Sequence, residues 1–166
     1  MIRNLLICLI ISLNLTALKA EGKPEKKFNI IEKAIYFNDK DFLEKSLSKG
    51  WQKKFTQFQF PPLFFAIMLK RNEMVKILIE KGKVDINEIY NDLSPLAFAV
   101  SFNLREVVEI LVQNGADLKF KTKTNINLSD IALQKGYTDL FFRLRRLGAP
   151  LPSIKNNSSQ VKKNTK

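Results

Sequence analysis

The feature that most constrains the fold of this chain is an internal repeat with a period of 33 residues. Three columns share this period: Gly82, Gly115 and Gly148; Ala66, Ala99 and Ala132; Leu78, Leu111 and Leu144. A fixed period of this length is typical of repeat proteins, in which each repeat buries its apolar face against its neighbours.

Each repeat has the pattern of two short helices joined by a turn. Pro62 and Pro95 begin two of the first apolar segments, and Ser94 and Asn127 stand where a helix cap is expected. Proline suits a first helical turn, where its missing N–H would be unpaired anyway, and a serine or asparagine side chain can accept a backbone N–H. The recurring glycines follow the second apolar segment, where a left-handed residue commonly ends a helix. We therefore predict helix–turn–helix repeats.

The third repeat resembles an ankyrin repeat. Residues 94–99, 106–111 and 115–117 are similar to that family's pattern Thr-Pro-Leu-His-x-Ala, then Glu-Val-Val-x-Leu-Leu, then Gly-Ala-Asp. The family's usual histidine is replaced by Phe64, Ala97 and Asp130 in three repeats. In the family this histidine forms structural hydrogen bonds, so the resemblance implies that its loss affects stability and not activity.

The neighbouring repeats are similar to the same pattern, and a degenerate repeat upstream matches with an offset of 32 residues. Between Gly82 and Asp85 the second repeat holds one extra residue, so we expect an irregular loop there. The resemblance implies an all-α ankyrin-repeat solenoid of about four repeats, with degenerate first and last repeats as caps. We place the repeats at about 28–59, 60–92, 93–125 and 126–152.

Polar residues at apolar positions support this reading of the two end repeats, because a solenoid presents a polar face at each end. In the first repeat the polar replacements are Lys33, Lys45 and Ser46, and in the last they are Arg143 and Arg145, with Arg146 beside them. The three arginines have two interpretations, a solvated cap or a contact patch for an anionic partner.

The two ends of the chain differ in composition from the repeats. Residues 4–18 are uncharged and apolar, but they are short for a membrane span of about 20 residues. We predict a signal peptide over 1–20, cleaved after Ala20, then a polar lead at 21–27. A disordered tail rich in Lys, Asn and Ser is predicted at 153–166. The protein is thus expected to be exported, periplasmic or secreted, or, if residues 4–18 are retained, tethered to a membrane.

The composition excludes several enzyme classes. The chain has no histidine and one cysteine, which excludes imidazole metal sites, a Ser-His-Asp triad and cysteine-based zinc sites. The candidate carboxylates Asp85, Asp117 and Asp130 stand where turns and a first helical turn are predicted, so we expect turn and cap roles for them. We therefore predict that the chain is not an enzyme and that it holds no cofactor and no metal.

Binding of a protein partner is the remaining class of function. The family resemblance implies contact positions in the loops that precede each first helix, called fingers, and at the ends of the first helices. These positions are Phe58, Phe60, Met68 and Leu69 in the second repeat, Tyr90, Asn91, Leu93, Ser101 and Phe102 in the third, and Lys123, Thr124, Ile126, Gln134 and Lys135 in the fourth. Many are apolar where solvent is expected, which favours an interface, although packing into the stack is an alternative for each Phe.

The predicted function is therefore a non-enzymatic protein–protein interaction module that acts as a monomer. The membrane-tethered module is one alternative, and a secreted effector acting on a host or neighbouring cell is another. The chain carries a net charge of +12, and Lys119, Lys121 and Lys123 alternate around Phe120. This alternation is a weak candidate for nucleic-acid binding, which we do not expect of an exported protein.

Overall fold

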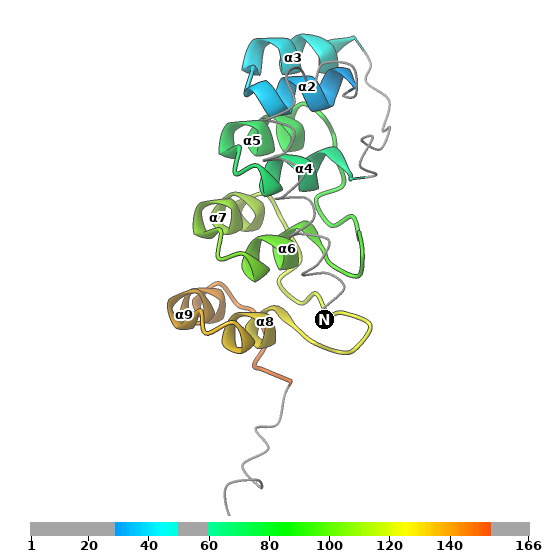
Figure 1. Cartoon of the computed structure of the whole chain (residues 1–166). Helices are drawn as coiled ribbons and strands as arrows, with labels where there is room; N and C mark the ends of the chain where they lie inside the picture. Colours follow the sequence, from blue (N-terminus) through cyan, green and yellow to red (C-terminus); the bar gives the residue numbers. More distant parts are fainter. Residues whose placement is uncertain (1–28, 50–59, 154–166) are drawn as a thin grey trace, which may run out of the picture. The chain divides into compact units, whose positions relative to one another are not determined.

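The computed structural model describes residues 29–49 and 60–153, which form eight helices and no strand (Figure 1). The helices are α2 (Ile30–Phe37), α3 (Lys40–Ser48), α4 (Pro62–Met68), α5 (Asn72–Glu80), α6 (Pro95–Ser101), α7 (Arg105–Gln113), α8 (Leu128–Gln134) and α9 (Thr138–Arg146). Each of the four predicted repeats holds one helix pair, so the all-α helix–turn–helix prediction is confirmed. The predicted signal peptide and lead, and the tail beyond Ser153, lie outside the described residues.

The chain divides between Asn91 and Asp92 into two compact units. In the first compact unit α2 packs on α3 and α4 packs on α5, while α2 also contacts α4 and α3 contacts α5. In the second compact unit α6 packs on α7 and α8 on α9, and α6 contacts α8. Each unit thus contains two helix pairs stacked with first helix against first helix (Figure 1).

The two helices of a pair differ in how much of their surface is buried. The first helices of the second and third repeats are short and apolar on all sides, and residues 62–67 and 95–100 are buried throughout. Helices of that kind belong in a core. The second helices are amphipathic: α7 buries Val107, Val108 and Leu111 and exposes Arg105. The second helices therefore present a charged face to solvent.

The turn inside each helix pair contains one residue in the left-handed conformation. These residues are Asn38, Lys70, Asn103 and Gly136, with φ of 58°, 54°, 54° and 72°. They form a further column with the repeat's period. Glycine and asparagine tolerate this conformation, whereas a lysine there is strained by its Cβ.

The glycine prediction at the ends of the second helices is confirmed at two of the three positions. Gly115 and Gly148 are left-handed, with φ of 89° and 101°. At Gly82 the prediction is wrong, because the extra residue in that loop moves the left-handed conformation to Lys83, with φ of 49°. Gly82 is needed for another reason: a Cβ there would lie 2.6 Å from the backbone oxygen of Leu78.

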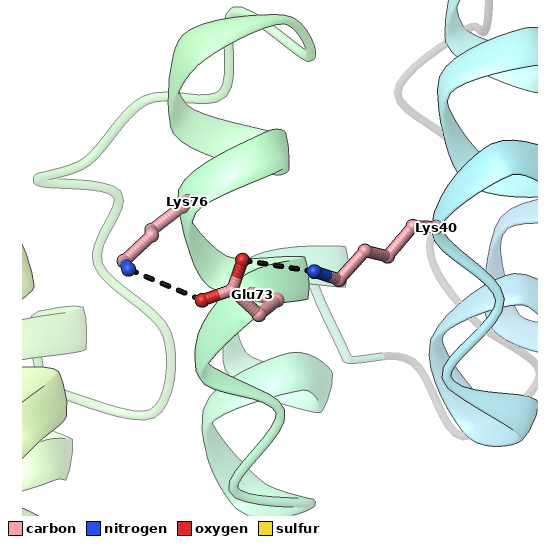
Figure 2. Close-up of polar contacts among 3 residues, drawn as sticks. All are labelled: Lys40, Glu73 and Lys76. Carbon is pink, nitrogen blue, oxygen red and sulfur yellow. Dashed lines mark hydrogen bonds and ion pairs between the residues drawn. The ribbon is translucent and has the colours of Figure 1, made fainter.

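Ion pairs join the second helices of neighbouring repeats in each compact unit. In the first unit Glu73 on α5 accepts hydrogen bonds from Lys40 on α3 and from Lys76, both at 3.1 Å (Figure 2). These two lysines hold the pKa of the Glu73 carboxyl below its ordinary value. In the second unit Arg105 pairs with Asp139 at 3.0 Å. Lys40 and Arg105 occupy equivalent repeat positions, as do Glu73 and Asp139.

Candidate partner-binding surface

The fingers of the third and fourth repeats are built on tight turns. Asn91 and Asp92 both have positive φ, of 49° and 65°, as in the two-residue turns of hairpins. In the fourth repeat Asn125 is left-handed, and the Thr122 N–H donates to the Ile126 oxygen at 2.9 Å. The short asparagine and aspartate side chains allow these left-handed turns, which bring the adjoining residues to the surface.

The fingers of the third and fourth repeats are also tied to each other within the second compact unit. The backbone N–H of Lys123 donates to both carboxylate oxygens of Asp92, at 3.0 and 3.1 Å. A charge-assisted contact of this kind orders both fingers relative to one another.

The start of each first helix holds its finger in place. Ser94 accepts the Ala97 N–H at 3.1 Å, which confirms its predicted role as a cap. Asn127 accepts the Asp130 N–H at 3.0 Å, and the Asp130 carboxylate accepts the Asn127 N–H at 2.9 Å. This reciprocal capping box confirms the cap roles of Asn127 and Asp130.

Asp85 and Asp117 close turns, as predicted. Each carboxylate accepts the backbone N–H two residues later, from Asn87 at 2.9 Å and from Lys119 at 2.8 Å. These contacts explain by local backbone chemistry why Asp recurs at this position of the second and third repeats. Among residues 29–49 and 60–153 no three metal-ligating side chains gather in one place.

In the first compact unit the predicted contact positions divide between core and surface. Phe60 is buried, and its ring packs on Tyr90 with centroids 5.1 Å apart. Its prediction as a contact residue is therefore wrong, because the ring fills the base of the finger. Tyr90 is half-buried and also packs on Phe64, at 5.5 Å. Phe58 lies outside the described residues.

The ends of the first helices in this unit present apolar side chains. Met68 and Leu69 are half-buried, and Asn91 in the finger is exposed. The sequence prediction missed Tyr36 and Phe37 at the equivalent positions of the first repeat, where Phe37 is 56% exposed. The offset of 32 residues between the first two repeats would have found both.

In the second compact unit the predicted positions are more polar. Phe102 is the exposed apolar member, and its ring stacks on Phe98 with centroids 4.9 Å apart. Of the other predicted positions, Leu93, Ser101 and Ile126 are half-buried, and Lys123, Thr124, Gln134 and Lys135 are exposed. Two exposed apolar residues were missed: Leu133 in the last turn of α8, and Ile89 in the finger that ends the first unit.

The three arginines of α9 have different environments. Arg143 forms a bidentate pair with Glu109, with its Nε 2.6 Å and its Nη2 2.8 Å from the two carboxylate oxygens. The pair raises the pKa of Arg143 and lowers that of Glu109. Arg145 donates to the Ala149 oxygen, and Arg146 is exposed. Arg143 therefore joins two repeats, in addition to covering the last one.

The helix pairs and finger turns agree with one comparison. The family model for ankyrin repeats, in three copies, matches residues 31–122, which is more than half of the chain. The chain belongs to the ankyrin-repeat family. The α8–α9 pair follows that match and has the same two-helix arrangement. No curated protein sequence matches this ankyrin-repeat chain.

Ankyrin repeats generally act as protein–protein interaction modules. Exposed apolar and cationic side chains occur at the fingers and the ends of the first helices, as at Phe37, Phe102 and Lys135, and others lie on the second helices, as at Phe42 and Phe142. Within residues 29–49 and 60–153, no helix is both long enough and apolar enough to cross a bilayer.

Proposed function

We propose that this chain is a non-enzymatic ankyrin-repeat module that binds a partner protein through its fingers and the ends of its first helices. The observation that carries the proposal is the exposure of aromatic side chains at these positions, 56% for Phe37 and 44% for Phe102. Exposed aromatic residues are common anchors of protein interfaces. Both rings pack on a neighbouring ring, Phe37 on Tyr36 and Phe102 on Phe98.

Ring packing matters for affinity because a side chain that is already held loses little entropy on binding. Within each compact unit the first helices beneath these positions are held by close packing, since residues 62–67 of the first unit and 95–100 of the second are buried. Each compact unit thus offers preformed contact positions, and we propose that the module acts as a monomer.

The double variant Phe37→Ala with Phe102→Ala tests this function. We expect it to lose at least tenfold in affinity for a partner cross-linked to the wild-type chain in its source cells, because interface anchors cost about 2 kcal/mol or more when truncated. Tyr90 is kept, because its ring packs on Phe60 and Phe64 and its loss would affect folding.

The matched control is Phe142→Ala on α9, an exposed aromatic residue outside the proposed surface. The control should bind as the wild type does, and all variants should keep the wild-type helical circular dichroism. Equal loss of binding in the control, or no loss in the double variant, would contradict the proposed surface.

We further propose that the module is exported and that residues 1–20 are removed. The support is the charge-free, mostly apolar run at 4–18, followed after Lys19 by a small residue, Ala20. N-terminal sequencing of the protein from its source should begin at Glu21. A chain that begins at Met1 and sediments with membranes would favour the tethered alternative.

A further inference from the structure

The second compact unit has a group of lysines without acidic partners on its proposed binding surface. We call Lys119, Lys121, Lys123 and Lys135 the lysine patch; three lie in the fourth finger, and Lys135 directly follows α8 as its C-cap. All four side chains are exposed, and none forms an ion pair with a residue that the structure describes. Such charges are free to attract an external anion.

The other face of the same unit is arranged differently. Two arginines of the second helices form ion pairs: Arg105 on α7 with Asp139, and Arg143 on α9 with Glu109. Two of the four arginines on these second helices are therefore paired with a carboxylate, whereas none of the four lysines of the lysine patch pairs with a carboxylate that the structure describes.

Two carboxylates lie in the fingers close to the lysine patch, and both are already engaged with the backbone. Asp92 accepts the Lys123 N–H, and Asp117 accepts the Lys119 N–H. None of the four lysines forms an ion pair with a residue that the structure describes, and four lysines face two carboxylates here, so the patch keeps an excess of positive charge.

The same compact unit also exposes apolar side chains, at the ends of α6 and α8. Phe102 and Leu133 are 44% and 42% exposed, and their helices pack on each other. The surface of this unit therefore combines apolar anchor positions with unpaired cations, which is the complement of a peptide that carries both apolar and acidic residues.

We propose that the second compact unit binds an acidic polypeptide segment that contains an apolar anchor residue. The proposal rests on the proposed function and specifies the chemistry of the partner. The lysine patch steers the acidic segment to the surface and sets its orientation. Phe102 and Leu133 then contact the anchor.

A polypeptide fits this surface better than a nucleic acid does. Binding of single strands needs exposed aromatic faces among the basic residues, on which bases can stack. The aromatic residue within the alternating lysines, Phe120, is only 8% exposed. The run from Lys119 to Lys123 therefore offers charge without a stacking platform.

Three labelled probes test the proposal against the full chain by fluorescence anisotropy. The first is a short peptide of glutamates around a central leucine and phenylalanine, the second replaces each glutamate by glutamine, and the third is an oligothymidylate of equal charge. We expect the glutamate peptide to bind at least tenfold tighter than the other two at low salt. Its advantage over the glutamine peptide should shrink as salt rises from about 0.05 M to about 0.5 M.

Variants locate the binding on the molecule. We expect Lys121→Gln and Lys135→Gln each to weaken binding of the glutamate peptide about two- to fivefold, as for single exposed ion pairs. The matched control is Lys45→Gln on α3, an exposed lysine of the first unit with no ion pair to a described residue. The control should leave the affinity unchanged.

Three outcomes would overturn the inference: equal binding of both peptides, tighter binding of the oligothymidylate, or equal effects of Lys45→Gln and Lys135→Gln. They are distinguishable from failure of the proposed function. If Phe37→Ala with Phe102→Ala abolishes capture of the natural partner while the lysine variants do not, the proposed binding surface is supported. The proposed preference of the second compact unit for acidic segments is then refuted.

Discussion

The first and fourth repeats begin their first helices differently from the second and third. In the first repeat the Asn29 side chain accepts the Glu32 N–H at 2.9 Å, and the Glu32 carboxylate accepts the Asn29 N–H at 2.6 Å. Asn127 and Asp130 form the same reciprocal box in the fourth repeat, at 3.0 and 2.9 Å. Each end repeat thus satisfies two free helix N–H groups with its own side chains.

The second and third repeats place proline in the first helical turn, at Pro62 and Pro95. Their residues equivalent to Glu32 and Asp130 are Phe64 and Ala97, both buried. This is the position where the ankyrin pattern has histidine, and none of the four repeats keeps it. The comparison shows that the position accepts either a carboxylate that bonds back to the cap residue or an apolar side chain that fills the core.

Phe64→Ala should have the largest effect, because the second repeat relies on packing at this position. Phe64 is 1% exposed and packs on the Tyr90 ring. Truncation of a buried phenylalanine costs about 3–5 kcal/mol of unfolding free energy through lost transfer energy and the remaining cavity. Urea unfolding followed by circular dichroism measures this cost. The exposed Phe142→Ala should stay within about 0.5 kcal/mol of wild type, and a similar loss in both variants would refute the packing role.

Asn127→Ala and Asn29→Ala compare the two capping boxes. Loss of a helix cap costs about 1 kcal/mol, which is the expected effect at Asn29. The Asn127 amide also donates to the Leu151 oxygen at 2.7 Å and the Ser153 hydroxyl at 3.0 Å. We therefore expect about 2–3 kcal/mol at Asn127, since the hydrogen bonds that its buried amide donates to residues 151 and 153 are lost as well. Equal costs at both positions, again by urea unfolding, would show that the contacts with residues 151–153 add nothing.

Much of this architecture is predictable from the sequence because its causes are local. The period locates the helix pairs, and Ser94, Asn127 and Asp130 act as caps because caps depend on residues three positions apart. Phe60 was misassigned since its burial depends on Tyr90, thirty residues later, which no periodic pattern reveals. Gly82 was misassigned because one inserted residue moved the left-handed turn to Lys83.

The surface is less predictable than the fold for a related reason. The periodic columns identify the positions of Phe102 and Lys135, but not whether a charged side chain there has a partner. The sequence allows a solvated cap or an anionic contact patch at Arg143, and its pairing with Glu109 depends on the orientation of α9 relative to α7. That orientation follows from core packing between repeats, which the repeat pattern leaves unspecified.

The turn inside each helix pair distinguishes the second repeat from the others, and a smaller, stabilising change tests it. Lys70 is left-handed where the other repeats have asparagine or glycine. A residue with a Cβ in the left-handed conformation destabilises the folded state by about 1–2 kcal/mol. Glycine removes this strain, but it lowers stability by about 0.4–1 kcal/mol because it gives the unfolded chain more conformational freedom. Lys70→Gly should therefore stabilise the chain by about 0.5–1 kcal/mol, raising its melting temperature. The reverse change, Gly136→Lys, should lower it; a rise there, or a fall for Lys70→Gly, would contradict the argument.

The smallest expected effect is the pH dependence contributed by the Glu109–Arg143 pair. Because the Arg143 guanidinium lowers the pKa of the Glu109 carboxyl, the folded state holds this proton less tightly than the unfolded chain does. The pair therefore stabilises the fold above the unfolded pKa of about 4.3, and this contribution is lost as the pH falls through the lower folded pKa. Melting temperatures of wild type and Arg143→Met should differ by a constant amount from pH 7 to about pH 5 and converge below it. A difference that persists to pH 3, or widens there, would mean that Arg143 stabilises α9 through its aliphatic stem and not through the Glu109 charge.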